Sequence, residues 1–396
     1  MTELSNAPHL RVVIVNFNGG ELLTRAVSSV LDAVWPSALD IVIVDNNSTD
    51  GSLAAVEKFD EVTTVALSTN DGFSAANNGF SRLPGLVDPD LYFLLNPDAA
   101  VESDTLLELA GGLADQDVGV AAPIILFDRE FVECRCDRGT VLVGVRVDGH
   151  DVASRCLGSL GVDRLPGDPG SLWHFSEAGT LQIPVLPEAR CVQLTRHSVD
   201  GTIIDEILID SLEPATQRIQ NAGGALDQRW FGTNVDYGAS VETVTPPREV
   251  QLWCGAAAMF KPQFLVDTGG FDDRYFLYYE DTDLSLVGGR LGWKYAFVPT
   301  AVVRHRHSDK TEQGTRLVEV LQHRNRLVMM ARHAPFAVFA KSLLRGFATP
   351  VSMMIRSGRV NGPVRAGLRR LATWRLAAVV EAVKILPSAL RSRRNL

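Results

Sequence analysis

Residues 10–51 read LRVVIVNFNGGELLTRAVSSVLDAVWPSALDIVIVDNNSTDG, two apolar runs on either side of a helical pattern. Leu10–Val15 is apolar apart from one arginine, and Ile41–Val44 is apolar throughout. Continuous apolar runs of this length are typical of strands buried on both faces of a parallel sheet. Between them, the apolar residues of Glu21–Val34 recur at helical spacing. The segment therefore predicts a strand, a helix and a second, parallel strand.

The same alternation continues beyond residue 51. Further helices are expected at Ser52–Phe59, Phe73–Leu83 and Thr105–Leu113, and further strands at Val62–Leu67, Leu91–Leu95 and Val118–Ala121. Strands that alternate with helices across short polar loops indicate an α/β fold, with an open, mostly parallel sheet and helices on both of its faces. Ligands of such sheets bind at the carboxyl ends of the strands.

Three loops at that edge carry acid, amide or glycine groups: Asn16–Gly20, Asp45–Gly51 and Asn96–Asp98. Each loop alone is also consistent with an ordinary turn or helix cap, where Asn, Asp and Gly are common. Their shared position at one edge of the sheet favours a binding site. The sequence has no GxGxxG after the first strand and no GxxxxGK[ST], so the usual phosphate loops of Rossmann dinucleotide-binding proteins and P-loop NTPases are missing.

The chain has 396 residues, 46% hydrophobic and 21% charged, which is enough for a globular protein with more than one domain. Four segments are expected: 1–127, 128–216, 217–310 and 311–396. In the second segment, short apolar runs are separated by Gly, Pro, Asp and Ser, which predicts a β-rich insertion. Its aromatic group Trp173–Phe175 is consistent with a sugar-stacking surface or, more simply, with an aromatic core.

The insertion also contains most of the cysteines. Four cysteines and three histidines lie there, namely Cys134, Cys136, Cys156, Cys191, His150, His174 and His197. Their spacing fits no CxxC pair, so ordinary thiols are favoured over a zinc site. Few cysteines and no recognisable signal peptide predict a cytoplasmic protein with reduced thiols.

Residues 271–307, FDDRYFLYYEDTDLSLVGGRLGWKYAFVPTAVVRHRH, contain the candidate catalytic groups. An aromatic run leads to three acids at the start of a predicted helix, and the next predicted strands end in two histidines. These residues are Glu280, Asp281, Asp283, His305 and His307. A carboxylate can act as a general base, and a histidine can hold a metal ion. Asp283 is better explained as a charge that complements the helix dipole, and His307 as a solvent-facing neighbour.

The C-terminal part of the chain is strongly basic. Arg316–Leu396 contains 16 Lys and Arg against 2 Asp and Glu, in a chain whose net charge is −9. Ala337–Ile355 and Val364–Leu390 both combine basic and apolar residues at helical spacing. The second pattern predicts an amphipathic helix on an anionic membrane surface. The alternatives are a helix packed on its own domain or on a dimer partner and, less favoured, nucleic-acid binding. No run of 18 uncharged apolar residues occurs, so no spanning helix is expected.

Several motifs, in order along the chain, resemble those of family 2 inverting glycosyltransferases of the GT-A fold, in particular rhamnosyltransferases and galactofuranosyltransferases. The motifs are VVIVNFNGGELLTRAVSSVL, VIVDNNSTDGS, STNDGFSAANNGF, YFLLNPDA, CGAAAMF and GGFDDRYFLYYEDTDLSLVGGRLGWKYAFVPTAVVRHRHS. The resemblance covers about residues 10–126 and 217–330 and leaves the insertion outside. It implies that the first and third segments are the donor and acceptor halves of one GT-A domain.

The resemblance also implies roles for individual residues. A nucleotide sugar with a dTDP or UDP carrier would be bound by Val15, Phe17, Asp45, Asn46, Gly72, Asn77, Asn96 and Asp98. Asn46 and Asn96 stand where many relatives have aspartate. Asp98 would bind Mg²⁺ or Mn²⁺ together with His305. Asp281 would be the general base, with Glu280 in support.

The favoured function is sugar transfer, from dTDP-rhamnose first of all, to a glycan or lipid-linked acceptor in cell-surface polysaccharide synthesis. The alternatives are a galactofuranosyl or other hexosyl transferase and, because Asn96 replaces an aspartate, a non-catalytic carbohydrate-binding protein. A nucleotidyltransferase is disfavoured, since no Gly-rich loop with Arg and Lys follows the first strand. The expected location is the inner face of the cell membrane, without a nucleic-acid partner, and a homo-oligomer is left open.

Overall fold

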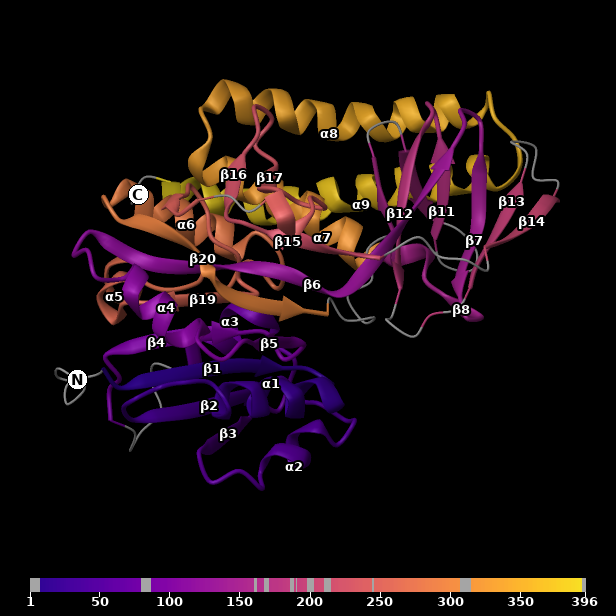
Figure 1. Ribbon diagram of the computed structural model, residues 1–396. Helices are drawn as coiled ribbons and strands as arrows, with labels where there is room; N and C mark the ends of the chain where they lie inside the picture. The colour runs from indigo at the N-terminus through magenta and orange to yellow at the C-terminus, as the bar shows by residue number, and fades with distance from the viewer. Residues whose placement is uncertain are drawn as a thin grey trace. The chain divides into compact units, whose positions relative to one another are not determined.

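The computed structural model describes most of the chain. The described residues are 8–79, 87–159, 162–166, 171–185, 189, 191–197, 203–209, 215–243, 246–306 and 315–393. The chain groups into two compact units, one formed by residues 1–128 and 219–307 and the other by residues 129–218 and 308–394 (Figure 1). The predicted insertion and the basic C-terminal segment therefore share the second unit.

The first unit is built on a large sheet with the strand order β18-β20-β6-β19-β4-β1-β2-β3. The bounds are β1 (Leu10–Asn16), β2 (Leu39–Asp45), β3 (Val62–Ala66), β4 (Leu91–Leu95), β6 (Val118–Cys136), β18 (Arg248–Glu249), β19 (Ala257–Phe260) and β20 (Lys294–His305). The first four strands pair in parallel, and β20 is parallel to β6, which confirms the predicted α/β sheet. β19 lies antiparallel between β4 and β6.

One predicted strand is much longer than expected. β6 runs on to Cys136 instead of ending at Ala121, because its second half pairs with β12 (Gly179–Val185) of the insertion. An apolar pattern marks only the part of a strand that is buried, and the outer half of β6 is polar on one face. The strand therefore belongs to both units.

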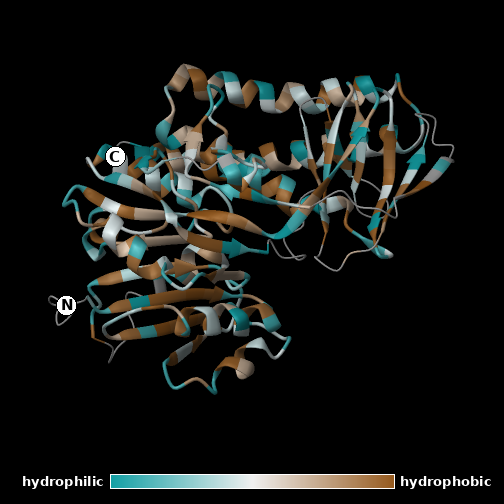
Figure 2. Cartoon of the chain, viewed as in Figure 1, coloured by the Kyte–Doolittle hydropathy of each residue, from teal (hydrophilic) through white to brown (hydrophobic). Residues whose placement is uncertain are grey.

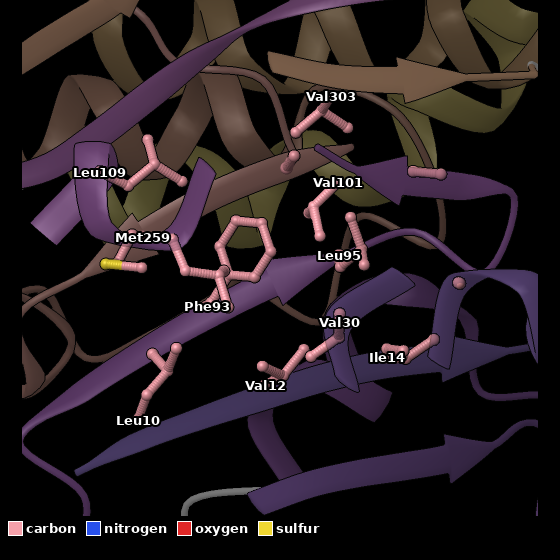
Figure 3. Close-up of a cluster of buried hydrophobic side chains, with 14 of the residues drawn as sticks. Leu10, Val12, Ile14, Val30, Phe93, Leu95, Val101, Leu109, Met259 and Val303 are labelled. Atoms are coloured by element: carbon pink, nitrogen blue, oxygen red, sulfur yellow. The ribbon is translucent and has the colours of Figure 1, made fainter. Parts of the chain in front are cut away.

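Helices cover this sheet and complete its core. They are α1 (Glu21–Leu31), α2 (Ser52–Val56), α3 (Gly72–Gly79), α4 (Thr105–Gly112), α5 (Pro262–Thr268) and α6 (Glu280–Arg290). Three short strands, β5 (Ala99–Val101), β16 (Gly224–Leu226) and β17 (Gly232–Asn234), belong to the same unit. Figure 3 shows Val12 of β1 beside Val30 of α1, and Phe93 of β4 beside Met259 of β19. Burial of each large apolar side chain stabilises the unit by about 1.5–3 kcal/mol. Figure 2 shows hydrophobic residues along these central strands.

The second unit contains the β-rich insertion, as the sequence predicts. Its strands are β7 (Val141–Val147), β8 (His150–Asp151), β9 (Leu157–Gly158), β10 (Val162–Pro166), β11 (Ser171–Phe175), β12, β13 (Val192–His197) and β14 (Ile203–Ile209). Six of them form an antiparallel sheet, in the order β10-β11-β7-β13-β14 with β8 also paired to β7. Trp173 and Phe175 are buried in its core, so the sugar-stacking surface is wrong and the aromatic-core interpretation holds.

Three helices complete the second unit: α7 (Arg316–His333), α8 (Phe336–Ser357) and α9 (Gly362–Ser392). The sequence places α9 on a membrane, but Val364, Leu368 and Leu371 are buried against Leu165 and Leu172 of the insertion. Amphipathic spacing predicted an apolar face correctly, and that face is covered by the insertion together with α7 and α8. In the described part of the chain, no helix is both long enough and apolar enough to span a bilayer.

Candidate active site

Asn16 and Asp45 end two adjacent parallel strands and lie opposite each other in the register of β1 and β2. Asn16 Nδ2 donates hydrogen bonds to Asp45 Oδ1 at 2.6 Å and to Ser52 Oγ at 2.9 Å. Asp45 Oδ2 accepts a further bond from the Ser48 backbone N–H at 2.8 Å. Both side chains are buried. Asp45 therefore shapes the loop after β2 through contacts within the protein.

Asn46 connects this loop to the next one. Its Nδ2 donates to the Gly72 carbonyl oxygen at 3.2 Å, and its Oδ1 accepts from the Asp71 backbone N–H at 3.3 Å. An ionised aspartate has no donor and could make only the second of these bonds. The amide thus suits this buried position, which gives a structural reason for the departure from the aspartate of many relatives.

Gly72 brings the loop after β3 against the segment that leads to α6. Its φ is +86°, and a Cβ at this position would lie 2.5 Å from the Phe276 carbonyl oxygen. The Phe73 backbone N–H donates to the same oxygen at 2.7 Å. Both the left-handed conformation and the close approach require a residue without a side chain. Gly72 therefore joins the predicted donor half of the site to the acceptor half.

The other predicted donor residues differ in exposure. Val15 and Asn77 are buried, whereas Phe17 is 46% exposed, the most exposed of the predicted donor side chains. Asn77 Nδ2 donates to the Phe73 carbonyl at 2.8 Å, and its buried Oδ1 has no hydrogen-bond partner among the described residues. Phe17 is thus placed to contact a flat ligand group, while Asn77 lies within the start of α3.

His305, at the end of β20, lies against the loop that follows β4. His305 pairs with Ala99 of β5, and the Arg306 backbone N–H donates to the Asp98 carbonyl at 2.9 Å. His305 Nε2 lies 3.0 Å from Asp98 Oδ1 and 3.3 Å from Asn96 Nδ2. Sheet pairing thus brings together the predicted metal-binding residues, although Asp98 and His305 are 207 positions apart.

Gln220 of β15 (Thr216–Asn221) fixes the orientation of this histidine. Its Oε1 lies 2.8 Å from His305 Nδ1, and both side chains are buried. An amide oxygen can only accept, so Nδ1 carries the hydrogen and Nε2 directs its lone pair toward Asp98. Gln220 lies in no sequence motif and reaches the site only through the pairing of β15 with β6, so the sequence did not predict it.

Asp98, His305 and Asn96 fit a divalent cation. A carboxylate oxygen and an imidazole nitrogen 3.0 Å apart, both with lone pairs, favour a cation or proton between them. Within the described ranges, no group of three or more His, Cys, Asp and Glu side chains could hold a metal. With its amide rotated so that Oδ1 instead of Nδ2 faces His305, Asn96 would complete such a shell together with the phosphate oxygens of a ligand, as is common for Mg²⁺.

A zinc site was the less favoured interpretation of the cysteines in the insertion. All five cysteines of the chain are free thiols, and Cys134 Sγ lies 3.9 Å from Cys136 Sγ on neighbouring positions of one strand face. Cys156 is buried. The described residues around them offer no zinc site, so the interpretation as ordinary thiols is favoured.

Glu280 and Asp281 begin α6. Asp281 Oδ2 accepts from the Gly255 backbone N–H at 2.9 Å, and its Oδ1 accepts from the Thr282 backbone N–H at 2.6 Å. Burial raises the pKa of Asp281, and these hydrogen bonds oppose the rise. Burial and the charge of Asp281 raise the pKa of Glu280 well above its usual range, and Glu280 Oε2 has no partner among the described atoms. The pair thus favours an ionised Asp281 beside a protonated Glu280.

The chain enters α6 through a strained turn. Tyr278 and Tyr279 have φ values of +73° and +71°, a conformation that costs a bulky residue about 1–3 kcal/mol. Strain of this kind concentrates at functional sites. Nearby, Tyr275 Oη donates to Asp283 Oδ1 at 2.9 Å with both groups buried, so Asp283 is a structural acceptor as well as a helix-terminal charge. His307 lies outside the described residues.

One turn of backbone connects the two halves of the site. The Asn96 backbone N–H donates to the Ala256 carbonyl at 2.9 Å, and the neighbouring Gly255 N–H donates to Asp281. The loop that carries Asp98 is therefore tied, through residues 254–257, to the carboxylate that begins α6. This arrangement places Asp98 and the buried carboxylate of Asp281 at one edge of the sheet, where group transfer from a phosphorylated ligand would need a ligand for a cation and a base.

Part of the chain is similar to known proteins. Residues 11–138 match the family model "Glycosyl transferase family 2". The N-acetylglucosaminyl-diphospho-decaprenol L-rhamnosyltransferases of two Mycobacterium tuberculosis strains are 30% identical over 113 residues, 28% of this chain and 37% of theirs. The chain thus spans only part of the length of these curated relatives.

A solved structure has a similar fold. The crystal structure of GalNAc-T7 with UDP, GalNAc and Mn²⁺ matches 83% of this chain and 48% of its own chain, with a TM-score of 0.51 and 16% identity. At this identity the similarity concerns the fold. The similarity in fold covers 83% of this chain, so it extends beyond residues 11–138 and includes strands contributed by the later part of the chain.

Proposed function

Since the chain carries a family 2 glycosyltransferase domain of the GT-A fold, we propose that it is an inverting, divalent-metal-dependent glycosyltransferase. It transfers a sugar from a nucleoside-diphosphate donor to a glycan or lipid-linked acceptor of a cell-surface polysaccharide. The first candidate donor is dTDP-L-rhamnose, because the partial relatives at 30% identity are rhamnosyltransferases. A galactofuranosyl or other hexosyl donor is the alternative.

The observation that carries this proposal is the backbone turn that ties Asp98 to Asp281. Through it, a metal-binding group and a candidate base are held at one edge of the sheet by two hydrogen bonds of 2.9 Å. The distance between Asp98 Oδ1 and His305 Nε2, 3.0 Å, supports the metal-binding half independently. A carbohydrate-binding protein without catalytic activity would not need the buried carboxyl pair Glu280 and Asp281 in addition to the metal-binding residues.

Asp281 acts as the base in the proposed reaction. It removes the proton from an acceptor hydroxyl, whose oxygen forms a bond to the anomeric carbon while the bond from that carbon to the diphosphate breaks. Because the acceptor attacks from the face opposite the leaving group, the anomeric configuration inverts. Asp98 and His305 would hold Mg²⁺ or Mn²⁺, which would supply positive charge to the departing diphosphate. Protonated Glu280 leaves the negative charge on Asp281.

The nucleotide would lie across the three loops that follow β1, β2 and β4. Phe17 is exposed and can stack on the base, while Asp45, Asn46 and Asn16 hold the loops through buried hydrogen bonds. The binding groups toward the nucleotide would therefore be backbone atoms and Phe17 more than the buried carboxylate. Gly72 and Asn77 would border the donor where the loop after β3 meets Phe276.

Replacing Asp281 tests this proposal. Asp281→Asn keeps the shape of the side chain and one acceptor oxygen for Gly255, but it loses the acceptor for Thr282 and removes the base. Transfer, measured as release of nucleoside diphosphate with an acceptor glycan across a panel of nucleotide sugars, should fall by about 10²–10⁴-fold, with nucleotide affinity retained. EDTA should stop the reaction of the native protein, and Mg²⁺ or Mn²⁺ should restore it.

Asp60→Asn, which removes an exposed carboxylate, is the matched control and should leave the rate unchanged. Near-full turnover by Asp281→Asn would remove the base assignment, and unchanged rates in EDTA would remove the metal. If no nucleotide sugar of the panel is consumed although nucleotide binds, the chain is a carbohydrate-binding protein instead.

We also propose that the protein works at the cytoplasmic face of the cell membrane, where a lipid-linked acceptor is presented. The basic C-terminal region supports this location, since anionic lipids attract clustered Lys and Arg. Whether it acts as a homo-oligomer would follow from sedimentation of the full chain.

A further inference from the structure

α8 has one face that packs within its own unit. Phe339, Pro350 and Ser357 are buried. A Cβ at Gly346 would lie 3.0 Å from Cγ2 of Val379, which shows how closely α8 approaches α9. These positions share one side of the helix, at about 100° per residue.

The side of α8 next to this packed face exposes an apolar stripe. It consists of Phe336, Leu344, Phe347, Val351, Met354 and Ile355, which are between 42% and 71% exposed. At about 100° per residue, these six side chains fall within a sector about 100° wide. A surface helix of a soluble domain normally turns polar residues to this side. The second unit by itself therefore leaves an apolar helix face in contact with water.

Basic residues lie along one edge of this stripe. Lys341, Arg345 and Arg356 are exposed, and their helical positions follow directly on those of the apolar sector. α8 contains no Asp or Glu among its 22 residues. Figure 2 shows apolar and polar residues alternating along the helix. The charge of this face is therefore complementary to an anionic surface.

We propose that the apolar stripe of α8 is a docking face for an anionic phospholipid surface. The helix lies in the plane of the membrane interface, with the stripe at the boundary of the acyl chains and with Lys341 and Arg345 among the headgroups. A second copy of the chain fits less well, because two such faces would bring like charges together. The inference deepens the proposed function, since a lipid-linked acceptor is met at this surface, but its test requires no sugar transfer.

Vesicle flotation of the full-length protein tests the proposal. Binding should be strong to vesicles of phosphatidylcholine with phosphatidylglycerol and weak to phosphatidylcholine alone. Lys341→Glu with Arg345→Glu should lower the partition coefficient about tenfold or more, because each basic residue near the surface adds to the attraction. Leu344→Gln with Ile355→Gln, which lie 71% and 61% exposed, should lower it to a similar extent by removing the apolar contact.

Matched variants away from α8 control for charge and hydropathy. Lys58→Glu with Arg138→Glu makes the same change in net charge at exposed positions. Both control residues lie outside α8, so flotation should stay at the native level.

Val266→Gln with Leu291→Gln removes two side chains that are 72% and 55% exposed in the first unit, and flotation should again be native. Equal losses in the α8 variants and the controls would overturn the proposal. So would native flotation of both α8 variants, which would assign binding to the exposed Leu376, Val380 and Val383 of α9. A concentration-dependent dimer that the Leu344→Gln, Ile355→Gln variant loses in sedimentation would make a second copy the occupant instead.

Discussion

Gln220 determines which nitrogen of His305 faces Asp98. The amide oxygen accepts from Nδ1, so that Nε2 is available as a ligand, and burial of both side chains prevents water from replacing the bond. Residues that orient a ligating histidine in this way typically contribute 10–100-fold to metal affinity. No sequence motif contains Gln220, and only its position on β15 makes it part of the site.

Replacing Gln220 should therefore weaken metal binding. Gln220→Leu removes the acceptor, and we expect the Mn²⁺ concentration for half-maximal transfer to rise about 10–100-fold. Gln220→Glu keeps an acceptor oxygen and should restore much of the affinity. Mn²⁺ titration in the presence of a nucleoside diphosphate measures both variants. Native Mn²⁺ affinity in a folded Gln220→Leu protein would contradict this role.

The elements around α6 are joined by a close contact between two loops. The turn at Gly72 reaches the Phe276 carbonyl, and two residues further on Tyr278 and Tyr279 take left-handed conformations before the helix begins. The start of α6, which carries Glu280 and Asp281, is thus held from the donor side. Strain in this segment is maintained only while the loop of Gly72 stays in place.

Gly72→Ala should disturb this contact more than a change of backbone preference alone would. A Cβ at Gly72 meets Phe276 atoms at 2.5 Å and 2.6 Å, whereas a Cβ at Gly292, where φ is +91°, meets nothing within 4 Å. Gly292→Ala is therefore the matched control for the cost of the positive φ, about 1 kcal/mol. Gly72→Ala should lose about 1–3 kcal/mol of the free energy of unfolding in chemical denaturation, and transfer activity with it. Equal losses in the two variants would show that the contact with Phe276 does not matter.

In the whole molecule, the proposed sites lie in two different units. All residues proposed for donor, metal and base lie in the unit of residues 1–128 and 219–307, and the apolar stripe of α8 lies in the other. The insertion belongs to this second unit and packs part of its core against α9, so its strands support the C-terminal helices. The unit proposed to bind sugar nucleotides and the unit proposed to face lipid are therefore distinct parts of one chain.

Hydrogen exchange of the full chain should report this division. A nucleoside diphosphate with Mn²⁺ should slow amide exchange at residues 15–18, 45–49 and 96–98, because a ligand of the folded state suppresses local opening where it binds. Exchange in β7 and β13 of the insertion should stay the same. Equal protection of those strands would mean that the insertion takes part in binding the nucleotide.

Part of this protein could be determined from its sequence alone. The βαβ alternation and the loops after the strands rest on periodicity, which is a local property of a chain, whereas the selection of Asp98, Asp281 and His305 rests on the resemblance to a family. The fold class was confirmed, residues 11–138 match the model of the predicted family, and the structure brings Asp98 and His305 within 3.0 Å. Secondary structure, and the edge of the sheet to which its loops belong, are encoded within short segments.

Only the tertiary structure decided the role of Gln220, the amide contacts of Asn46 and the choice between α8 and α9 as the exposed amphipathic helix. Each of these depends on pairing or packing between segments far apart in the chain, as in the contact of Gln220 with His305 across 85 positions. Hydrophobic spacing shows that a helix has an apolar face, but not what covers it. The insertion, α7 and α8 cover that face on α9, whereas the stripe of α8 stays open, because burial is a property of the assembled core.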